Sequence, residues 1–558
     1  MEKSEIMYPT DNKLNQPQGV SSRIEQHVNK NIAAWQHLQY GMFIHWGLYS
    51  KIAGVWNGKP VTKGYNEQIK MWADISDRDY LEVAKQFSAE KFDPKEICSL
   101  AKDAGMKYIV FTTKHHDGFC MFSTTTTDYN IVDSSPFGQD PLKLLAEECR
   151  NHGLKLGIYF SLVDWHQGHG FDLNNCNPIP ESMEPMIENQ LRELLTHYGP
   201  LAEVWFDMSS PTLSQSMKFK SIVRELQPEA VVNSRIWNNV GDFRTLGDNE
   251  VPSVTLDGAW QTPASIYHST WGYRSWQERD NVSTKVQELA KSLVSVRANG
   301  GNYLLNIGPR GDGSIVEFEA NVLRGIGSWL NRHSGACLGL SATQFGKQSW
   351  GEVMADNENL FLFVTDWPKS RELTLSGLAT DVLQVAENGA TSTLQWSHKE
   401  NNLVITLPEE PIDEVLPVIK VELDGKLRIL PERTIAESDG SWTIHPKSLY
   451  LRHGYTDQGN YKSVVQTTVR LTAYLSTRTD GKVSLNLEGQ AKPDFRYRVQ
   501  VGNSVQVVTG QKLTESAIGP FTLSTNQVVP LTITRAEPAH AGEELDLIFH
   551  SAVLKTLV

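Results

Sequence analysis

The residue best suited to covalent chemistry is an aspartate that ends a strongly apolar run. Asp207 directly follows Trp205 and Phe206, and burying a carboxylate there is costly unless it is hydrogen-bonded or has a chemical role. It could instead cap a following helix, but the next helical pattern begins only near Ser214. A catalytic carboxylate is therefore the favoured interpretation. Arg235, at the end of the next apolar run, is a charged bidentate donor that could hold such a carboxylate.

Histidines close two other apolar runs. His45 and Trp46 end the run GMFIHW, and His115 and His116 stand in the word TTKHHDGF. A lone buried histidine is often a core residue satisfied by the backbone, and two adjacent histidines could bind a metal. Successive strand residues point to opposite faces, so both imidazoles reach one site only if the strand ends there, and no further ligand spacing accompanies them. We therefore expect no metal, and we assign these rings to hydrogen bonds with substrate hydroxyls.

The elements that must position these side chains alternate between two kinds of pattern. Short apolar runs occupy residues 40–46, 107–115, 154–164, 202–208, 230–235 and 302–308. Amphipathic segments occupy residues 94–104, 141–152, 181–198, 214–226, 284–298 and 316–331. Apolar strands separated by helices predict a parallel sheet, and alternation of this length favours a (β/α)8-like barrel over an open sheet. In such a barrel the functional side chains gather at the C-terminal ends of the strands.

The pattern changes to short alternating strands joined by Gly, Asn, Asp and Pro turns after about residue 338. This change predicts all-β sandwich domains behind the barrel. The expected division is an N-terminal extension at 1–30, a catalytic barrel at 31–337, a β-sandwich at 338–435 and a second β-sandwich at 436–558. The last domain could bind carbohydrate or brace the barrel, and its few aromatic residues favour the structural role.

Composition excludes several classes of partner. The 558 residues carry a net charge of −13, which argues against a nucleic-acid partner. No run approaches the roughly 18 apolar residues that span a bilayer.

The five cysteines are scattered, which is typical of free thiols. No apolar leader is visible at the N-terminus, and we expect a periplasmic or secreted protein whose signal has been removed rather than a cytoplasmic one. The oligomeric state stays open.

Seven stretches of the sequence, in order between residue 41 and about residue 313, match one known family. They are GMFIHWGLYS, FTTKHHDGFCMFST followed by TDYN, GIYFSLVDWH, EVWFDM, VVNSRI, STWGYRSW and NYLLNIGPRGDG. Together they resemble the α-L-fucosidase family of retaining glycoside hydrolases, glycoside hydrolase family 29. The words KHHDGF and WFDM on successive strands make the resemblance specific. It covers most of the barrel and, more loosely, the first β-sandwich.

The resemblance implies hydrolysis of a terminal α-L-fucosyl residue of an oligosaccharide or glycoconjugate, with retention and without metal or cofactor. By the same resemblance Asp207 would be the nucleophile. Residues that would contact the sugar are His45, Glu67, His115, His116, Tyr159, Trp205 and Arg235. The C6 methyl of fucose would need an apolar wall, for which Phe43, Trp46 and Trp271 are candidates, with core packing as the alternative role of each.

The general acid/base is where the sequence departs from the family pattern. Family members carry a Glu after an Asp-Phe-x-Thr word or after a Trp upstream of WGYR. Here the first word, GDFRT, is followed by Leu and Gly, and the second position is Gln261, which cannot donate a proton usefully. Glu250 is the nearest suitable carboxyl group, and Asp248 and Asp257 are its rivals. We expect Glu250 to be the acid/base.

Two other functions remain open at this point. One is a carbohydrate-binding protein on the same fold that has lost its acid/base. The other is a glycosidase for a related sugar such as an α-L-galactoside, which differs from the fucoside only at C6.

Overall fold

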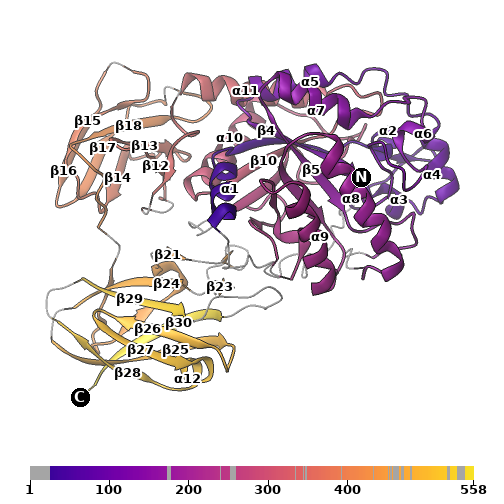
Figure 1. Cartoon of the computed structure of the whole chain (residues 1–558). Coiled ribbons are helices and arrows are strands. Elements are labelled where there is room, and N and C mark those ends of the chain that lie inside the picture. Colours follow the sequence, from indigo (N-terminus) through magenta and orange to yellow (C-terminus); the bar gives the residue numbers. More distant parts are fainter. Residues whose placement is uncertain are drawn as a thin grey trace.

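The computed structural model describes residues 26–557 except 173–176, 239, 252–258, 334, 344, 346–347, 391, 412, 431–432, 450, 453–454, 457–463, 467–469, 478–479, 525–527 and 537–546. Among these residues, eight parallel strands curl into a barrel (Figure 1). They are β1 (Tyr40–Ile44), β4 (Tyr108–Lys114), β5 (Lys155–Ser161), β6 (Leu201–Asp207), β7 (Val231–Val232), β8 (Arg244–Thr245), β9 (Trp260–Ser265) and β10 (Asn302–Ile307). The barrel that the alternating pattern predicts is confirmed.

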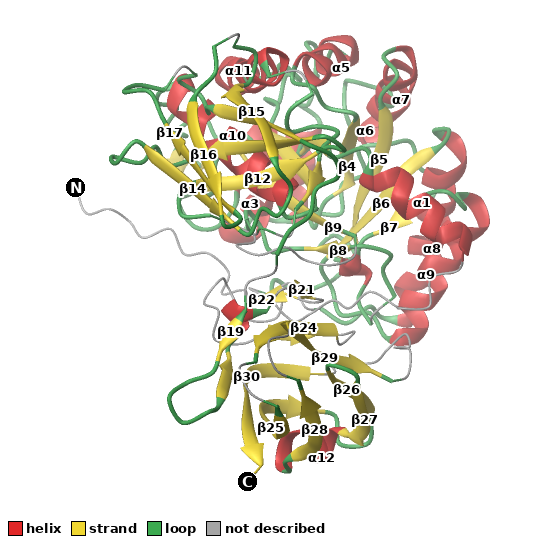
Figure 2. Cartoon of the chain, turned by 90° about the vertical axis from the view of Figure 1, so that its left-hand side faces the viewer, coloured by secondary structure: helices red, strands yellow, loops and turns green. Residues whose placement is uncertain are grey.

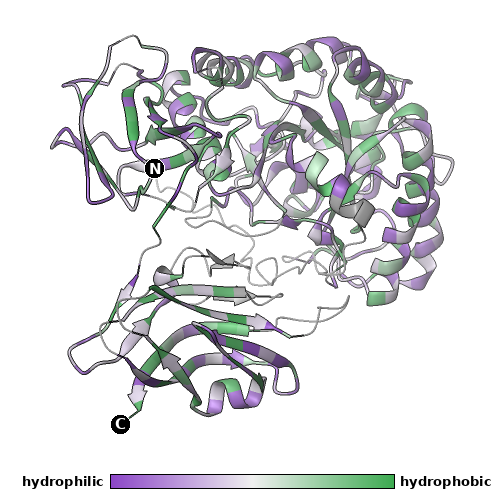
Figure 3. Cartoon of the chain, turned by 60° about the vertical axis from the view of Figure 1, so that its left-hand side comes forward, coloured by the Kyte–Doolittle hydropathy of each residue, from purple (hydrophilic) through white to green (hydrophobic). Residues whose placement is uncertain are grey.

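Helices cover the outside of the barrel. They are α4 (Asp77–Ala84), α5 (Pro94–Asp103), α7 (Pro141–Asn151), α8 (Glu184–His197), α9 (Leu213–Leu226), α10 (Val282–Ala298) and α11 (Glu317–Arg332). Helix α1 (Gln26–Gln36) instead packs Ile32 and Trp35 into the core inside the barrel. Helices α5 and α7 begin at Asp93 and Asp140, whose carboxylates accept backbone N–H groups of the first turn, and each has proline at the first helical position. In Figure 3 the outer helices alternate between hydrophobic and hydrophilic residues, as amphipathic helices on a sheet must.

Short elements fill the loops at the C-terminal ends of the strands. They are α2 (Leu48–Ile52), the hairpin β2 (Val55–Trp56) and β3 (Lys59–Pro60), η1 (Asn66–Gln68), α3 (Ile69–Trp72), α6 (Ile131–Ser134), η2 (Glu181–Met183) and η3 (Ser234–Ile236). Two of these short helices, η1 and η3, carry pocket residues.

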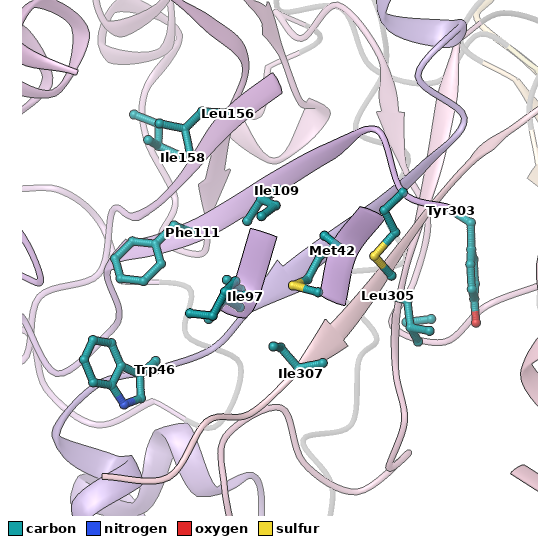
Figure 4. Close-up of a cluster of buried hydrophobic side chains, with 14 of the residues drawn as sticks. Met42, Trp46, Ile97, Ile109, Phe111, Leu156, Ile158, Tyr303, Leu305 and Ile307 are labelled. Carbon is teal, nitrogen blue, oxygen red and sulfur yellow. The ribbon is translucent and has the colours of Figure 1, made fainter. Parts of the chain in front are cut away.

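Alternation along each strand sends side chains to two separate cores. On β1, Met42 and Ile44 belong to the core between sheet and helices, which also contains Ile97 of α5. Figure 4 shows Met42 and Ile97 in this core. Phe43 lies on the other face and packs with Trp205 in the barrel interior. Successive strand residues face opposite sides of the sheet, so on β1 the odd-numbered side chains face the barrel axis.

The barrel closes between β7 and β8 through side chains more than through a ladder. In the described part of the chain no ladder joins these strands, and the backbone links are one bridge, Asn233 to Phe243, and the N–H groups of Asp242 and Phe243, which donate to the carbonyl of Val232 at 2.7 and 3.4 Å. Beside it the Asp242 carboxylate accepts the N–H of Val232 at 2.8 Å and also pairs with Lys220 of α9 at 2.8 Å. We refer to this junction of residues 231–245 as the seam.

Two antiparallel sheets follow the barrel. One contains β11 (Ser341–Ala342), β12 (Gly351–Ala355), β13 (Asn359–Val364), β18 (Val418–Leu423) and β15 (Val382–Glu387), and the other contains β14 (Glu372–Ser376), β17 (Asn402–Thr406) and β16 (Gln395–Lys399). They enclose a core of their own. The outer face of the first sheet joins the barrel core through Phe361 and Phe363, and Trp329 of α11 donates to the carbonyl of Leu416 at 2.9 Å. This sandwich therefore braces the helices on one side of the barrel.

A further β-structure with its own hydrophobic core lies beyond residue 433, set apart from the barrel in Figures 1 and 2. Its strands are β19 (Thr434–Ile435), β20 (Trp442–Ile444), β21 (Leu451–Arg452), β22 (Tyr455–Thr456), β23 (Val464–Gln466), β24 (Arg470–Ser476), β25 (Gly481–Ala491), β26 (Arg496–Val501), β27 (Ser504–Thr509), β28 (Ile518–Leu523), β29 (Val528–Arg535) and β30 (Leu547–Leu557), with η4 (Pro446–Ser448) and α12 (Gly510–Glu515) between strands. The domain boundaries predicted from the sequence stay predictions. Over the described ranges, every helix is too short or too polar to cross a membrane.

Candidate active site

A pocket of about 360 Å³ opens at the C-terminal ends of the barrel strands. This volume includes the part of the pocket that is open to solvent. The lining comes from β1, β5, β6 and the loops beyond β1, β4, β6, β7, β8 and β9: Phe43, His45, Tyr65, Glu67, Gln68, His115, His116, Tyr159, Trp205, Asp207, Met208, Arg235, Asp248 and Trp271. The structure thus brings together ten of the site residues predicted from the sequence, although they are spread along the chain from Phe43 to Trp271.

Asp207 is held in the pocket by two donors. The hydroxyl of Tyr159 donates to Oδ2 at 2.7 Å, and Nη1 of Arg235 donates to Oδ1 at 2.9 Å. Burial and the neighbouring Asp207 raise the pKa of Tyr159 well above its usual value, so the phenol keeps the proton that it donates. Hydrogen bonds to a charged acceptor are stronger than neutral ones. The carboxylate is therefore fixed in one orientation.

Arg235 connects Asp207 to a second carboxylate. Its Nη2 donates to Oδ1 of Asp248 at 2.8 Å, and its guanidinium lies 4.8 Å from the ring centre of Trp205. Burial favours the neutral form of the guanidinium, but Asp207 and Asp248 outweigh it and raise the pKa of Arg235. One permanent positive charge is thus shared by two acidic groups, as the sequence position of Arg235 suggested for Asp207 alone.

Asn233 positions the end of β6, which carries Asp207, and was not recognised in the sequence. Its Oδ1 accepts the N–H of Phe206 at 2.8 Å, and its Nδ2 donates to the carbonyl of Phe206 at 2.9 Å. Paired residues of β7 end at Val232, so this side-chain amide continues the pairing to β6 for one more residue. The chain is then free to turn through η3, which carries Arg235. A buried asparagine directly after a strand is the signal that could have identified it.

Hydrogen bonds fix the tautomers of two pocket histidines. Asn306 donates its Nδ2 to the carbonyl of Trp271, so its Oδ1 accepts from Nδ1 of His45 at 2.7 Å. Ser161 donates its hydroxyl to the carbonyl of Val163, so its oxygen accepts from Nδ1 of His116 at 2.6 Å. Burial lowers the pKa of both imidazoles to about 3. Each ring is therefore neutral and keeps Nε2 as a hydrogen-bond acceptor.

His115 reaches the same pocket because β4 ends just before it. The strand stops at Lys114 after an irregularity in its pairing with β5, which satisfies the condition under which adjacent histidines can share a site. Burial lowers the pKa of His115 as well, and its Nδ1 has no hydrogen-bond partner among the described residues. Within the described ranges, no group of three or more His, Cys, Asp or Glu side chains is arranged to hold a metal.

Glu67 is the third carboxyl group of the pocket. Its Oε2 accepts the backbone N–H groups of Trp271 and Gly272 at 3.1 and 2.9 Å, and burial raises its pKa to about 7. Tyr65 and Gln68, its neighbours on the η1 loop, also line the pocket. Both were missed in the sequence, although they flank Glu67 in the word GYNEQI.

Aromatic rings form the apolar part of the lining. Phe43 lies 5.3 Å from Trp205 and 5.9 Å from Trp271, measured between ring centres, in edge-on contact with both. Tyr159 stacks on Trp205 at 5.6 Å. The pocket thus has polar side chains on part of its lining and aromatic rings, among them Phe43 and Trp271, on another part.

Trp205 is supported from inside the barrel by a buried polar network. Its Nε1 donates to Oε1 of Gln261 at 2.8 Å, and the Gln261 amide donates to Glu203 and to the hydroxyl of Tyr108. Glu203 also accepts from Trp35, and burial raises its pKa to about 7. Gln261 therefore lies in the barrel interior beneath the pocket and does not line the pocket itself.

Two predicted site residues lie outside the pocket. Trp46 belongs to the outer shell: its ring stacks on Phe92 at 4.8 Å, its Nε1 donates to the carbonyl of Arg310, and Figure 4 shows it among outward side chains. It follows the inward His45, so strand alternation turns it away from the barrel axis. Its assignment to the sugar is corrected accordingly.

Glu250 is the second of these residues. Its Oε2 accepts the N–H of Gly247 at 2.8 Å, which ties the carboxylate into its own turn instead of placing it in the pocket lining. Burial raises its pKa, but its contacts are those of a turn-bracing residue. Its rival Asp248 does line the pocket, and Asp257 lies outside the described residues.

Comparisons with known proteins agree with this geometry. A family model described as alpha-L-fucosidase matches residues 8–335, which include every barrel strand. Tissue alpha-L-fucosidase of Homo sapiens is 28% identical over 411 residues, covering 69% of this chain and 86% of the human protein. The structure of Thermotoga maritima alpha-fucosidase with a mechanism-based inhibitor is 27% identical, with a TM-score of 0.58 over 69% of this chain and 96% of that one. The alpha-L-fucosidase structure from Vibrio sp. strain EJY3, 24% identical, shares the fold over 96% of this chain and 98% of its own, with a TM-score of 0.67. This chain belongs to the alpha-L-fucosidase family.

Proposed function

We propose that the pocket releases terminal α-L-fucosyl residues from oligosaccharides or glycoconjugates by double displacement, with Asp207 forming the covalent bond to the sugar. The observation that carries this proposal is the pair of donors on Asp207, Tyr159 at 2.7 Å and Arg235 at 2.9 Å. A carboxylate held in one orientation at the bottom of this pocket is arranged as a nucleophile for an anomeric carbon.

The polar part of the lining suits a neutral sugar. Each sugar hydroxyl can donate one hydrogen bond and accept others, so it needs partners of both kinds. His45 and His116 present Nε2 acceptors, and His115 has a buried Nδ1 that still lacks a partner. Glu67 adds a further acceptor, since only one of its carboxyl oxygens receives the backbone N–H groups of Trp271 and Gly272. None of the three rings carries charge near neutral pH, which matches an uncharged ligand.

The aromatic part of the lining supports a 6-deoxy sugar, and the enclosure supports action at a chain end. The rings of Phe43 and Trp271 are largely apolar, a suitable surface for a methyl group and a poorer one for a hydroxymethyl group. Most of the pocket residues are buried in the mouth of the barrel, which supports the entry of a terminal sugar residue.

Double displacement requires two steps. In the first, Asp207 attacks the anomeric carbon, and the bond to the leaving oxygen breaks as that oxygen receives a proton from a second carboxyl group. In the second, water attacks the same carbon, gives its proton to the second group and releases Asp207 as a carboxylate. Two inversions leave the α configuration unchanged.

Replacement of Asp207 tests the proposal. For Asp207→Asn we expect kcat/KM on 4-nitrophenyl α-L-fucoside to fall on the order of 10⁴-fold or more. For Asp207→Gly, azide can enter the vacated space and attack directly, so we expect β-L-fucosyl azide, the product of one inversion. Asp103→Asn, on the outer end of α5, is the matched control and should keep full activity. An Asp207→Asn variant within about tenfold of the wild type would refute the proposal.

A further inference from the structure

Three carboxyl groups line the pocket in the described part of the chain: Glu67, Asp207 and Asp248. If Asp207 is the nucleophile, as proposed above, one of the other two must move the proton. We propose that Asp248 is the general acid and base of this enzyme. The inference rests on the proposed function, and it replaces the sequence expectation for Glu250 with the neighbouring side chain that faces the pocket.

Asp248 lies next to Asp207 through a shared partner. Retaining glycosidases place their two carboxyl groups about 5–5.5 Å apart. Asp207 and Asp248 accept from the two terminal nitrogens of the same Arg235 guanidinium, at 2.9 and 2.8 Å, so they are immediate neighbours. Glu67 instead belongs to the loop after β1. In the order of strands around the barrel, β4 and β5 lie between β1 and β6, the strand that carries Asp207. Only Asp248 shares a partner with the nucleophile.

Asp248 lies closer to solvent than the other two carboxyl groups of the pocket. The side chain of Asp248 is 16% exposed, that of Asp207 is 8% exposed, and Glu67 is 2% exposed. In a pocket that takes a terminal sugar, the leaving oxygen points toward the mouth, because the rest of the glycan extends into solvent. A proton donor must therefore lie nearer to the mouth than the nucleophile, as Asp248 does. Glu67 is placed to hold a hydroxyl at the bottom.

The turn that carries Asp248 is firmly held. The carboxylate of Glu250 accepts the backbone N–H of Gly247, the residue before Asp248. The side-chain oxygen of Asn249, the residue after Asp248, accepts the N–H of Ser265 at 2.7 Å. Asn249 also donates its backbone N–H to the carbonyl of Pro263 at 2.9 Å, with a left-handed φ of 58°. The contacts of Asn249 thus attach the turn to β9, and the contact of Glu250 with Gly247 closes the turn. Glu250 acts here as a positioning residue for Asp248.

The charge that Arg235 faces changes between the two steps. Before the first step its guanidinium donates to both Asp207 and Asp248, at 2.9 and 2.8 Å. When Asp207 becomes an ester it loses its charge, and Arg235 is left to stabilise Asp248, which has given up its proton, as a carboxylate.

Atoms and electrons balance across both steps. In the first, an oxygen of Asp207 bonds to the anomeric carbon, the electron pair of the broken glycosidic bond goes to the leaving oxygen, and that oxygen takes the proton of Asp248. In the second, water oxygen bonds to the same carbon, its proton goes to Asp248, and the pair of the ester bond returns to Asp207. The products are fucose and the free alcohol, and both aspartates regain their starting states.

Two aryl substrates test the proposal with variants of the intact chain. Phenyl α-L-fucoside needs protonation of its leaving oxygen, whereas 4-nitrophenyl α-L-fucoside needs little. For Asp248→Ala we expect kcat/KM on the phenyl substrate to fall about 10²–10⁴-fold and on the nitrophenyl substrate by less than about tenfold. Added azide should raise kcat on the nitrophenyl substrate and yield α-L-fucosyl azide, because the anion attacks the fucosyl-enzyme without base assistance. An unfolded variant could give neither result.

Two further variants decide between the carboxyl groups. Glu250→Gln keeps an oxygen that accepts from Gly247, so we expect equal, small losses on both substrates and no azide effect. Glu67→Gln should lose activity on both substrates alike. The proposal is overturned if Glu67→Gln or Glu250→Gln shows the leaving-group split and α-azide product, or if Asp248→Ala shows neither. Loss of activity in Asp207→Asn together with such a result would leave the proposed function standing and remove only this inference.

Discussion

Removing the Asn233 side chain should separate the stability of the barrel from the placement of its nucleophile. Asn233→Ala deletes both hydrogen bonds to the Phe206 backbone, of 2.8 and 2.9 Å, and leaves one buried N–H and one buried carbonyl without partners. Each unsatisfied group costs about 1–3 kcal/mol, so the free energy of unfolding should fall by about 2–6 kcal/mol. Because Phe206 immediately precedes Asp207, a displacement of about 1 Å would also lower kcat about 10²-fold.

The matched control is Asn302→Ala. Asn302 is equally buried, and its Nδ2 donates to the carbonyl of Trp35 at 2.9 Å, but it begins β10 at the end of the barrel far from the pocket. We expect it to lower the urea midpoint of the barrel while kcat on 4-nitrophenyl α-L-fucoside stays near the wild-type value. Asn233→Ala should lower both. If both variants lose stability and kcat falls equally in each, or in neither, Asn233 has no particular hold on Asp207.

Three other predictions follow from the same contacts. Trp46→Phe should lower the melting temperature, because it loses packing on Phe92 and a hydrogen bond, yet leave KM unchanged; a changed KM would place the ring in the pocket after all. Glu203 has a pKa raised from its ordinary value to about 7, so its contribution to stability is full below about pH 4.5 and is lost, by about 3 kcal/mol, as pH rises through 7. Urea midpoints between pH 5 and 8 should show this loss, and Glu203→Gln should reduce the slope; an unchanged slope would contradict it. The rings of Phe43 and Trp271 should favour α-L-fucosides over α-L-galactosides by up to about 10²-fold in kcat/KM, and a preference for the galactoside would refute this role.

Strands and helices with a strong hydrophobic pattern could be predicted from the sequence. A strand that points polar side chains into the barrel could not. Strands β1, β4, β5, β7 and β10 lie within the predicted apolar runs, β6 begins one residue before its run, and α5, α7, α8, α9, α10 and α11 match the amphipathic segments. Strand β9, by contrast, reads WQTPAS and contains a proline. Its inward Gln261 is buried only because Glu203, Trp205 and Tyr108 satisfy it. Partners so distant in sequence leave no local pattern.

The candidate site was largely predictable because its residues end strands. Asp207, His45 and His115 stand where apolar runs stop, and the C-terminal ends of barrel strands converge on one mouth. Strand alternation also contained the answer for Trp46, since an inward His45 requires an outward neighbour. Trp46 takes the alternative role that was named for it, core packing.

The acid/base could not be settled from the sequence because it depends on the path of a loop. Asp248, Asn249 and Glu250 are consecutive, and each could face the pocket. Which one does so is decided by Ser265 and Pro263 on β9, which hold Asn249, and by the turn that Glu250 closes. These contacts are set by tertiary structure, not by residue type.

The seam has a consequence for how this chain tolerates change. Where two strands are joined by a full ladder, a residue inserted within one strand shifts every later pair of the register. At the seam the backbone links among the described residues are the bridge from Asn233 to Phe243 and the N–H groups of Asp242 and Phe243 that donate to the carbonyl of Val232, and the Asp242 carboxylate adds side-chain links. We therefore expect a residue inserted at the seam to shift few pairs of the barrel. Such an insertion would instead move Arg235 or Asp248, so alterations of length at this joint act on reactivity and leave the scaffold standing.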